Sequence, residues 1–436
     1  MSVEKTINQF LDEEYKDYAM YVISNRAIPS LVDGQKSSTR KILYVADRTT
    51  RREKCKVNVL AGRIIADAQY MHGNVSAEDA IVGMAQNFKN NLPLLENIGT
   101  YGSIRNPYAA SSRYISTRIS DKFDSIFKDD FLLEYNEVDG KFCEPKFYLP
   151  IIPIILVNGS SGIAVGFACN ILQRDPIDII NACLGVLSGK KVKLGPVSIP
   201  QFFGEVEVDP NNPKRWELKG KFEKVRNSIH VRELPPSMTY EKYEKLLDHL
   251  INSKKIKSYE DMGKGSIHYV VKPNGELDPY KDLKLSEWET ENFTTLDEFG
   301  KLKIFERAEE IVEHFVNFRL GFYTKRKEWY INKISNELKL ISNRGKFIKL
   351  ILDGRIQINN KPKSEIVISC QENDLETIDD DYDYLLKMPI YSLTKELFDK
   401  MKVEFKVKKA ELEGLKSADP CQMYIDDLTE LKKKLK

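Results

Sequence analysis

The spacing of hydrophobic residues changes twice along this chain of 436 residues and divides it into three regions. In the first 135 or so residues, short apolar groups at helical spacing are separated by polar turns such as Asp33-Gly34. This pattern predicts a basic helix at about residues 38–47 and further helices at 57–70 and 77–88. Short helices that include a basic one favour a helix-turn-helix or winged-helix module, which lays one helix against a groove of DNA.

The second region, residues 147–302, contains β-branched apolar runs that Gly, Pro and Asn interrupt. Such runs predict strands, and the stretches of helical spacing between them predict helices, as in an α/β region. The strands are predicted at residues 151–157, 163–165, 206–208 and 268–271, and the helices at 177–187 and 240–251.

The third region has a helical pattern. Apolar residues recur at spacings of three and four from Ile311 to Ile341, and no proline occurs in residues 300–361. A helix of roughly forty residues would span ~60 Å at ~1.5 Å per residue. A second charged stretch, residues 392–416, is predicted to run back antiparallel to it, although periodicity alone fits an ordinary helical bundle equally well. The three regions together predict an α+β multidomain chain.

Composition excludes several classes of protein. The chain is 42% hydrophobic and 30% charged, and it has no apolar run near the ~18–20 residues of a membrane span. The first residues are polar and acidic, unlike a secretory signal. The six cysteines and five histidines are scattered without zinc-site spacing, so we expect free thiols and no metal or cofactor site on this chain.

The net charge of +2 is less informative than its distribution. Residues 36–56 contain only two acidic side chains, Asp47 and Glu53, against eight basic ones. The basic side chains are Lys36, Arg40, Lys41, Arg48, Arg51, Arg52, Lys54 and Lys56. Such a patch can neutralise phosphates and displace their counterions, but a solvated helix face has the same composition.

The segment AASSRYISTRIS, residues 109–120, holds a candidate nucleophile, Tyr114. A tyrosine hydroxyl has a pKa near ~10 and needs a neighbouring base, cation or metal to act as a nucleophile at neutral pH. Arg113 and Arg118 could supply positive charge to the phenolate and to a phosphorane-like transition state. Local chemistry alone does not single out Tyr114, because the chain has 21 tyrosines.

Two other segments suggest ligand sites but favour simpler interpretations. The glycine-rich stretch 157–170 lacks both the G-x-G-x-x-G and the P-loop patterns, so it predicts a tight turn that allows close backbone approach. The acidic stretch 378–384 could hold Mg²⁺, but a solvated loop before a helix is the favoured interpretation.

Several of these segments resemble those of type IIA DNA topoisomerases, in matching order along nearly the whole chain. The resemblance is carried by YAMYVISNRAIPSLVDGQK (18–36), YGSIRNPYAASSRYISTRIS (101–120) and, most specifically, LPIIPIILVNGSSGIAVGFACNI (149–171). It is greatest to the split enzymes of T-even phages, whose cleavage function lies on a separate subunit. The resemblance implies a winged-helix DNA-binding domain at 1–145, an α/β tower domain at 146–302, and a coiled coil with a dimerisation gate at 303–436.

The resemblance also implies roles for single residues at the cleavage site. Tyr114 matches the tyrosine that forms a 5′-phosphotyrosyl link with DNA, and Arg113 matches its transition-state partner. Arg26 and His72 match residues that line the cleavage site.

Four further positions match residues that contact the DNA duplex. Lys36, Arg40 and Lys41 correspond to basic residues that grip the backbone. Ile163 corresponds to an isoleucine that is wedged between base pairs and bends the cleaved segment.

The same resemblance implies partners. Since the chain shows no ATPase or TOPRIM pattern, ATP and Mg²⁺ are expected on a large partner subunit, in an A2B2 assembly built on a homodimer of this chain. No DNA-wrapping domain follows the gate helices before Lys436, so relaxation and decatenation are expected rather than supercoiling. The expected place of action is the cytoplasm of a phage-infected cell.

Two alternatives are distinct in class. A non-catalytic DNA-bending protein could retain the same scaffold without cleavage. A tyrosine recombinase would need a His-x-x-Arg motif, and no histidine of this chain has an arginine three residues later.

Overall fold

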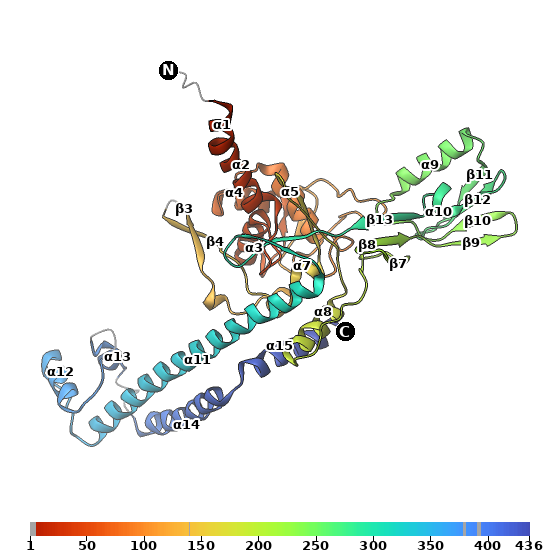
Figure 1. Ribbon diagram of the computed structural model, residues 1–436. Helices are drawn as coiled ribbons and strands as arrows, with labels where there is room; N and C mark the ends of the chain where they lie inside the picture. The colour runs from red at the N-terminus through yellow and green to blue at the C-terminus, as the bar shows by residue number, and fades with distance from the viewer. Residues whose placement is uncertain (1–5, 139, 378–380, 390–393) are drawn as a thin grey trace. The chain divides into compact units, whose positions relative to one another are not determined.

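Figure 1 shows the computed structural model of the protein, which describes residues 6–138, 140–377, 381–389 and 394–436. The chain forms two compact units. One comprises Met1–Arg319 with Ile425–Lys436, and the other comprises Leu320–Tyr424. The acidic stretch considered above for Mg²⁺ lies partly outside the described residues.

The first unit opens with helical elements. The chain enters through α1 (Ile7–Phe10) and α2 (Lys16–Val22), each followed by a π-helical segment, Leu11–Tyr15 and Ile23–Ala27. Three longer helices then pack on one another: α3 (Ser37–Thr50), α4 (Val57–Asp67) and α5 (Asn74–Ala85). Their positions agree with the three helices predicted from apolar spacing.

Burial explains why these three helices form. The side chains of Ile42 in α3, Leu60 and Ile64 in α4 and Ile81 in α5 are fully buried. Leu60 and Ile64 are four residues apart, a spacing that places them on one face of α4. At the start of α3, the Thr39 hydroxyl accepts a hydrogen bond from the Lys36 amide at 3.0 Å, which satisfies one of the free donors there.

The first unit also contains short antiparallel strand pairs. They are β1 (Cys55–Lys56) with β2 (Ser116–Thr117), β3 (Tyr135–Val138) with β4 (Lys141–Pro145), and β5 (Ser160–Ile163) with β6 (Ala168–Ile171). Helices α6 (Phe123–Ile126) and α8 (Pro176–Leu187) lie between or after them.

One predicted strand is wrong. Residues 151–157 do not extend; Ile154–Val157 forms the one-turn helix α7, with all four side chains buried. Pro150 and Pro153 explain the difference, because a proline has no N–H for a strand ladder and favours the first turn of a helix. The Leu156 amide closes that turn on the Pro153 carbonyl at 3.0 Å.

The middle of the chain builds two antiparallel sheets and a separate hairpin. The first sheet has the order β13 (Ser286–Thr290), β8 (Asn212–Lys219), β7 (Glu205–Asp209). The second has the order β11 (Ile256–Asp261), β12 (Tyr269–Pro273), β10 (Ser228–Val231), β9 (Phe222–Val225). The hairpin consists of β14 (Phe293–Leu296) and β15 (Leu302–Phe305).

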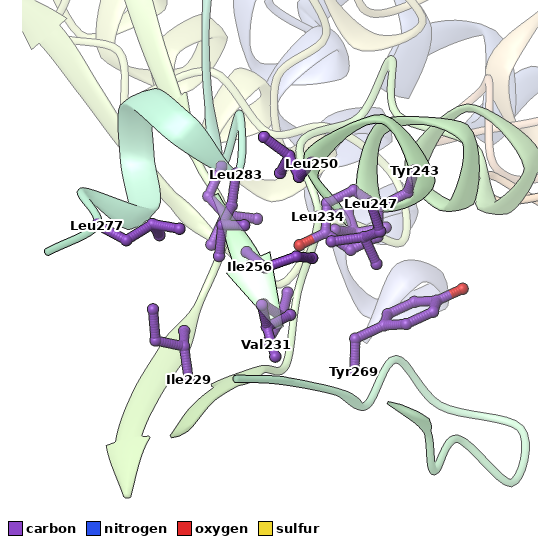
Figure 2. Packing of buried hydrophobic residues seen from close by; sticks show 12 residues of the cluster. Ile229, Val231, Leu234, Tyr243, Leu247, Leu250, Ile256, Tyr269, Leu277 and Leu283 are labelled. Atoms are coloured by element: carbon purple, nitrogen blue, oxygen red, sulfur yellow. The ribbon is translucent and has the colours of Figure 1, made fainter. Parts of the chain in front are cut away.

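The second sheet has its own hydrophobic core. Helix α9 (Tyr240–Asn252) places Tyr243, Leu247 and Leu250 in one buried cluster with Ile229 and Val231 of β10 (Figure 2). Helix α10 (Pro279–Asp282) follows the sheet and is flanked by the buried Leu277 and Leu283. These residues form a core that is separate from that of helices α3–α5.

The remaining elements are helical: α11 (Ala308–Leu352), α12 (Lys363–Glu372), α13 (Asp383–Leu386), α14 (Lys395–Ser417) and α15 (Pro420–Leu435). Within the second unit, α11 and α14 run antiparallel, as predicted. Lys327 of α11 donates to the carbonyl of Lys416 at 2.8 Å, and Glu337, farther along α11, pairs with the earlier Lys408. Close to these contacts along the two helices, Ile334, Leu338 and Leu412 form a small apolar core.

Buried ion pairs join segments of the first unit that are far apart in sequence. Glu291 accepts two hydrogen bonds from Arg174 at 3.0 and 2.8 Å, one from the Trp216 indole at 2.9 Å and one from the Leu172 amide at 3.1 Å. Both charged residues of this pair are at most 4% exposed. Arg105 likewise contacts Glu233 at 2.5 Å.

We expect Glu291→Gln to lower the free energy of unfolding by about 3–5 kcal/mol, because the buried Arg174 guanidinium loses its counter-charge. The matched control is Glu241→Gln, which breaks the exposed helical pair with Lys245 and should change stability little. Urea denaturation of the two variants measures the difference, and equal midpoints would contradict the prediction.

Candidate functional site

Tyr114 lies on a turn whose main chain is held on both sides. Its amide donates to the Ser111 carbonyl at 2.8 Å, and its carbonyl accepts a hydrogen bond from the Lys56 ammonium at 3.0 Å. The side chain itself is 68% exposed, whereas the next residue, Ile115, is buried. The turn therefore presents the phenol to solvent from a fixed backbone.

The strands beside this turn extend the support. β2 pairs with β1 in the register Lys56↔Ser116, and Ser116 also exchanges two main-chain hydrogen bonds with Ile98 at 3.0 and 2.9 Å. The Tyr101 hydroxyl donates to the Ser116 carbonyl at 2.8 Å. Burial raises the pKa of Tyr101 to about 12, so this hydroxyl keeps its proton and remains a donor.

The two arginines near Tyr114 have different surroundings. The Arg113 guanidinium lies 5.1 Å from the centre of the Tyr114 ring and is exposed, so it can reach an anion bound at the phenol. Arg118 instead forms a two-point contact with Glu96 at 2.6 and 2.9 Å. The positive charge predicted from Arg118 is therefore largely neutralised by a carboxylate.

Arg26, Lys41 and His72 gather around Tyr70. His72 packs edge-on against the Tyr70 ring with 5.3 Å between centres, and Lys41 and His72 line the same hollow of about 400 Å³. Burial raises the pKa of the Tyr70 hydroxyl, and the nearby charge of Arg26 opposes that shift. The Lys41 ammonium contacts Glu144 at 3.0 Å and the Ala68 carbonyl at 2.6 Å.

Arg40 is buried, although the sequence suggests a DNA contact. Its guanidinium binds Asp33 at 2.8 and 3.1 Å, and Asp33 also accepts from the Tyr148 and Gln35 amides at 3.0 Å each. The Asp33 carboxylate thus joins Arg40 to the distant segment at Tyr148. The predicted contact with a phosphate stays a prediction, and in this conformation it would compete with the Asp33 pair.

Lys36 contacts the β5–β6 hairpin, on which Ile163 lies. The Lys36 ammonium donates to the Ser161 carbonyl at 2.7 Å, and burial lowers the pKa of Lys36. Two residues along β5, Ile163 is 88% exposed. A Cβ on Gly162 would lie 2.0 Å from the Ala27 carbonyl oxygen, so only glycine lets the hairpin pack here.

The predicted residues therefore fall into separate groups: Arg113 with Tyr114, Arg26 with Lys41 and His72, and Lys36 with Ile163. The link between Lys56 and the tyrosine turn was not predicted. The two residues are 58 positions apart, and only the pairing of β1 with β2 brings them together.

Among the described residues, no group of three or more His, Cys, Asp or Glu side chains is arranged to hold a metal ion. No helix among them is long and apolar enough to cross a membrane.

A sequence model of the family of DNA gyrase/topoisomerase IV A subunits matches residues 26–431. The chain belongs to this family. It is 34% identical to the DNA topoisomerase medium subunit of Enterobacteria phage T4, over 98% of this chain and 99% of that protein. It is 31% identical to the mitochondrial DNA topoisomerase 2 of Dictyostelium discoideum, over 99% of this chain but only 35% of that longer protein.

A solved structure agrees with this assignment to the gyrase/topoisomerase IV family. The crystal structure of the Plasmodium falciparum topoisomerase II DNA-binding, cleavage and re-ligation domain matches with a TM-score of 0.84 and 30% identity. The match covers 98% of this chain and 64% of that one. The α+β fold is thus similar to that of a type II topoisomerase cleavage domain, and the family is that of cleavage and religation subunits.

We expect Gly162→Ala to destabilise the protein by about 1–3 kcal/mol, because the added methyl group overlaps a main-chain carbonyl. Gly185→Ala in α8 is the matched control, since nothing lies within 4 Å of its added Cβ. Gly185→Ala should leave the free energy of unfolding unchanged or raise it by up to ~1 kcal/mol, because alanine favours a helix more than glycine does. Thermal unfolding distinguishes the two, and an unchanged midpoint for Gly162→Ala would refute the close approach.

Proposed function

We propose that this chain is the DNA cleavage and religation subunit of an ATP-dependent type IIA topoisomerase, with Tyr114 as the nucleophile. The observation that carries the proposal is the exposed phenol on an anchored turn with Arg113 beside it, in a chain that the family model matches over residues 26–431.

The proposed reaction is a reversible transesterification at a phosphodiester of the DNA backbone. The Tyr114 oxygen attacks the backbone phosphorus and loses its proton, a 5′-phosphotyrosyl bond forms, and the 3′-oxygen leaves and takes up a proton. Arg113 stabilises the charge that develops on the phosphoryl oxygens. Religation reverses the exchange, so the bond energy is retained and resealing needs no ATP.

The proposed architecture assigns residues 1–145 to a winged-helix DNA-binding domain. Helices α3, α4 and α5 pack together, and the β1–β2 pair lies directly beside the tyrosine turn, which supports this assignment. We assign residues 146–302 to a tower domain and 303–436 to an antiparallel coiled coil with a gate. The apolar cluster of Phe347, Cys370 and Leu385 in the second unit would stabilise the gate.

DNA contacts are proposed at Lys36, Arg40, Lys41 and Ile163, with Arg26 and His72 near the scissile phosphate. The exposure of Ile163 supports its role as a wedge between base pairs. Lys36 would support the same role indirectly, by holding the hairpin on which Ile163 lies.

We propose that ATP and Mg²⁺ are bound by a large partner subunit, and that two copies of each protein form an A2B2 assembly through a homodimer of this chain. The word "medium" in the name of the T4 relative implies other subunits in that enzyme. Relaxation and decatenation on DNA in a phage-infected cell are the proposed activity and place of action.

We expect Tyr114→Phe to reduce covalent capture of DNA by roughly a hundredfold or more, because it removes the nucleophilic oxygen but keeps the ring. Tyr108→Phe is the matched control, since Tyr108 is 73% exposed on the same segment. Each variant is combined with the ATPase/TOPRIM partner, Mg²⁺, plasmid and a cleavage poison, and then denatured. Protein attached to DNA ends is measured.

Duplex binding should be nearly equal for wild type, Tyr114→Phe and Tyr108→Phe. Covalent capture by Tyr114→Phe would refute the assignment of the nucleophile. A wild-type chain that binds and bends DNA but leaves no attached protein would favour the non-catalytic bending protein instead.

We expect Ile163→Ser to reduce DNA bending and to weaken duplex binding several-fold, because an apolar wedge is needed to hold a base step open. Ile368→Ser is the control, since it makes the same change at an exposed isoleucine of α12. Energy transfer between dyes on the ends of a duplex of about 30 base pairs measures the bend. Equal bending by both variants would contradict the role of Ile163.

A further inference from the structure

Lys56 donates a hydrogen bond to the main-chain carbonyl of Tyr114, which accepts none from the described residues of its own turn. The Tyr114 amide is taken by the Ser111 carbonyl, but the Tyr114 carbonyl accepts from the Lys56 ammonium at 3.0 Å. The flanking Ile115 carbonyl accepts from the Val57 amide at 3.2 Å. Two consecutive carbonyls of the site are therefore held by two consecutive residues, Lys56 at the end of β1 and Val57 at the start of α4.

The position of this ammonium matters because the turn is exposed. Tyr114 has no buried side chain to fix it, so its orientation depends on the main chain on either side. A displacement of about 1 Å at a reacting atom can reduce a rate by about a hundredfold. An ammonium anchored on a paired strand limits the rotation of the residue that has to meet the phosphorus atom.

We infer that Lys56 is a positioning residue of the cleavage reaction, which holds the turn bearing Arg113 and Tyr114 through the Tyr114 carbonyl. The inference rests on the proposed function, because it assigns Lys56 a role only if Tyr114 is the nucleophile. It differs from a phosphate contact, which would act through DNA affinity, and from a fold-stabilising contact, which would act through the unfolding midpoint.

The experiment compares Lys56→Met, Lys56→Arg and the control Lys346→Met. Lys346 is an exposed lysine of the second unit that donates to the Asp374 carbonyl at 2.9 Å, so its replacement removes the same charge and the same kind of bond. Each protein is assembled with Mg²⁺ and the ATPase/TOPRIM partner. Duplex affinity, the rate of covalent adduct formation on saturating DNA, and the thermal midpoint are measured separately.

We expect Lys56→Met to form adduct about ten- to a hundredfold more slowly on saturated DNA, with affinity within about threefold of wild type and an unchanged midpoint. Lys56→Arg can donate to the same carbonyl and should recover most of the rate. Lys346→Met should resemble wild type in all three measurements.

A wild-type rate for Lys56→Met on saturating DNA would overturn the inference. A loss of duplex affinity by Lys56→Met with an unchanged rate would also overturn it, because that result indicates a phosphate contact. A slower rate that accompanies a lower thermal midpoint, and that Lys56→Arg does not recover, would overturn it as well, because that result indicates a fold-stabilising contact. The Tyr114→Phe variant keeps the two proposals separate. If it still forms adduct, the proposed function fails; if it does not, and Lys56→Met is normal, only the role of Lys56 fails.

Discussion

The main-chain hydrogen bonds around residue 114 are the interaction on which the proposed chemistry depends. A phenol that attacks a DNA backbone has to be open to a ligand as large as a duplex, so it cannot be fixed by burial of its ring. In this protein the ring of Tyr114 is exposed while its amide and carbonyl are both bonded and Ile115 is buried beside it. Rigidity is thus supplied through the backbone, and the side chain remains accessible.

Buried carboxylates join other segments of the first unit through hydrogen bonds. Asp33 bonds Arg40 and the Tyr148 amide, and Glu291 bonds Arg174 and the Trp216 indole. Each carboxylate gathers segments that are far apart in sequence, and each is buried enough for loss of one partner to be costly. These carboxylates therefore help to hold the connecting segments in place.

The β5–β6 hairpin shows how a close backbone contact can support an exposed apolar side chain. Gly162 allows the Ala27 carbonyl to approach, and the Lys36 ammonium bonds the neighbouring Ser161 carbonyl. Ile163 follows at once and is exposed. The proposed role of Ile163 as a wedge between base pairs would use this exposed side chain.

The sequence by itself determined the elements whose signals are local. Apolar spacing was sufficient for helices α3, α4 and α5 and for the long helix α11, because helical periodicity is a property of neighbouring residues. The order of motifs determined the family and pointed to Arg113 and Tyr114. The apolar segment 151–157 predicts a strand, but Ile154–Val157 forms helix α7. Pro150 and Pro153 account for this difference, and their effect is local.

Only the tertiary structure decided which basic side chains are already bonded within the protein and which are open to a ligand. Arg40, Arg118 and Lys56 look alike in the sequence, yet the first is buried on Asp33, the second is bonded to Glu96 and the third holds the Tyr114 carbonyl. Their partners lie 7, 22 and 58 residues away in sequence. Such pairings depend on how strands and loops meet in space, and no periodicity or local propensity encodes that meeting.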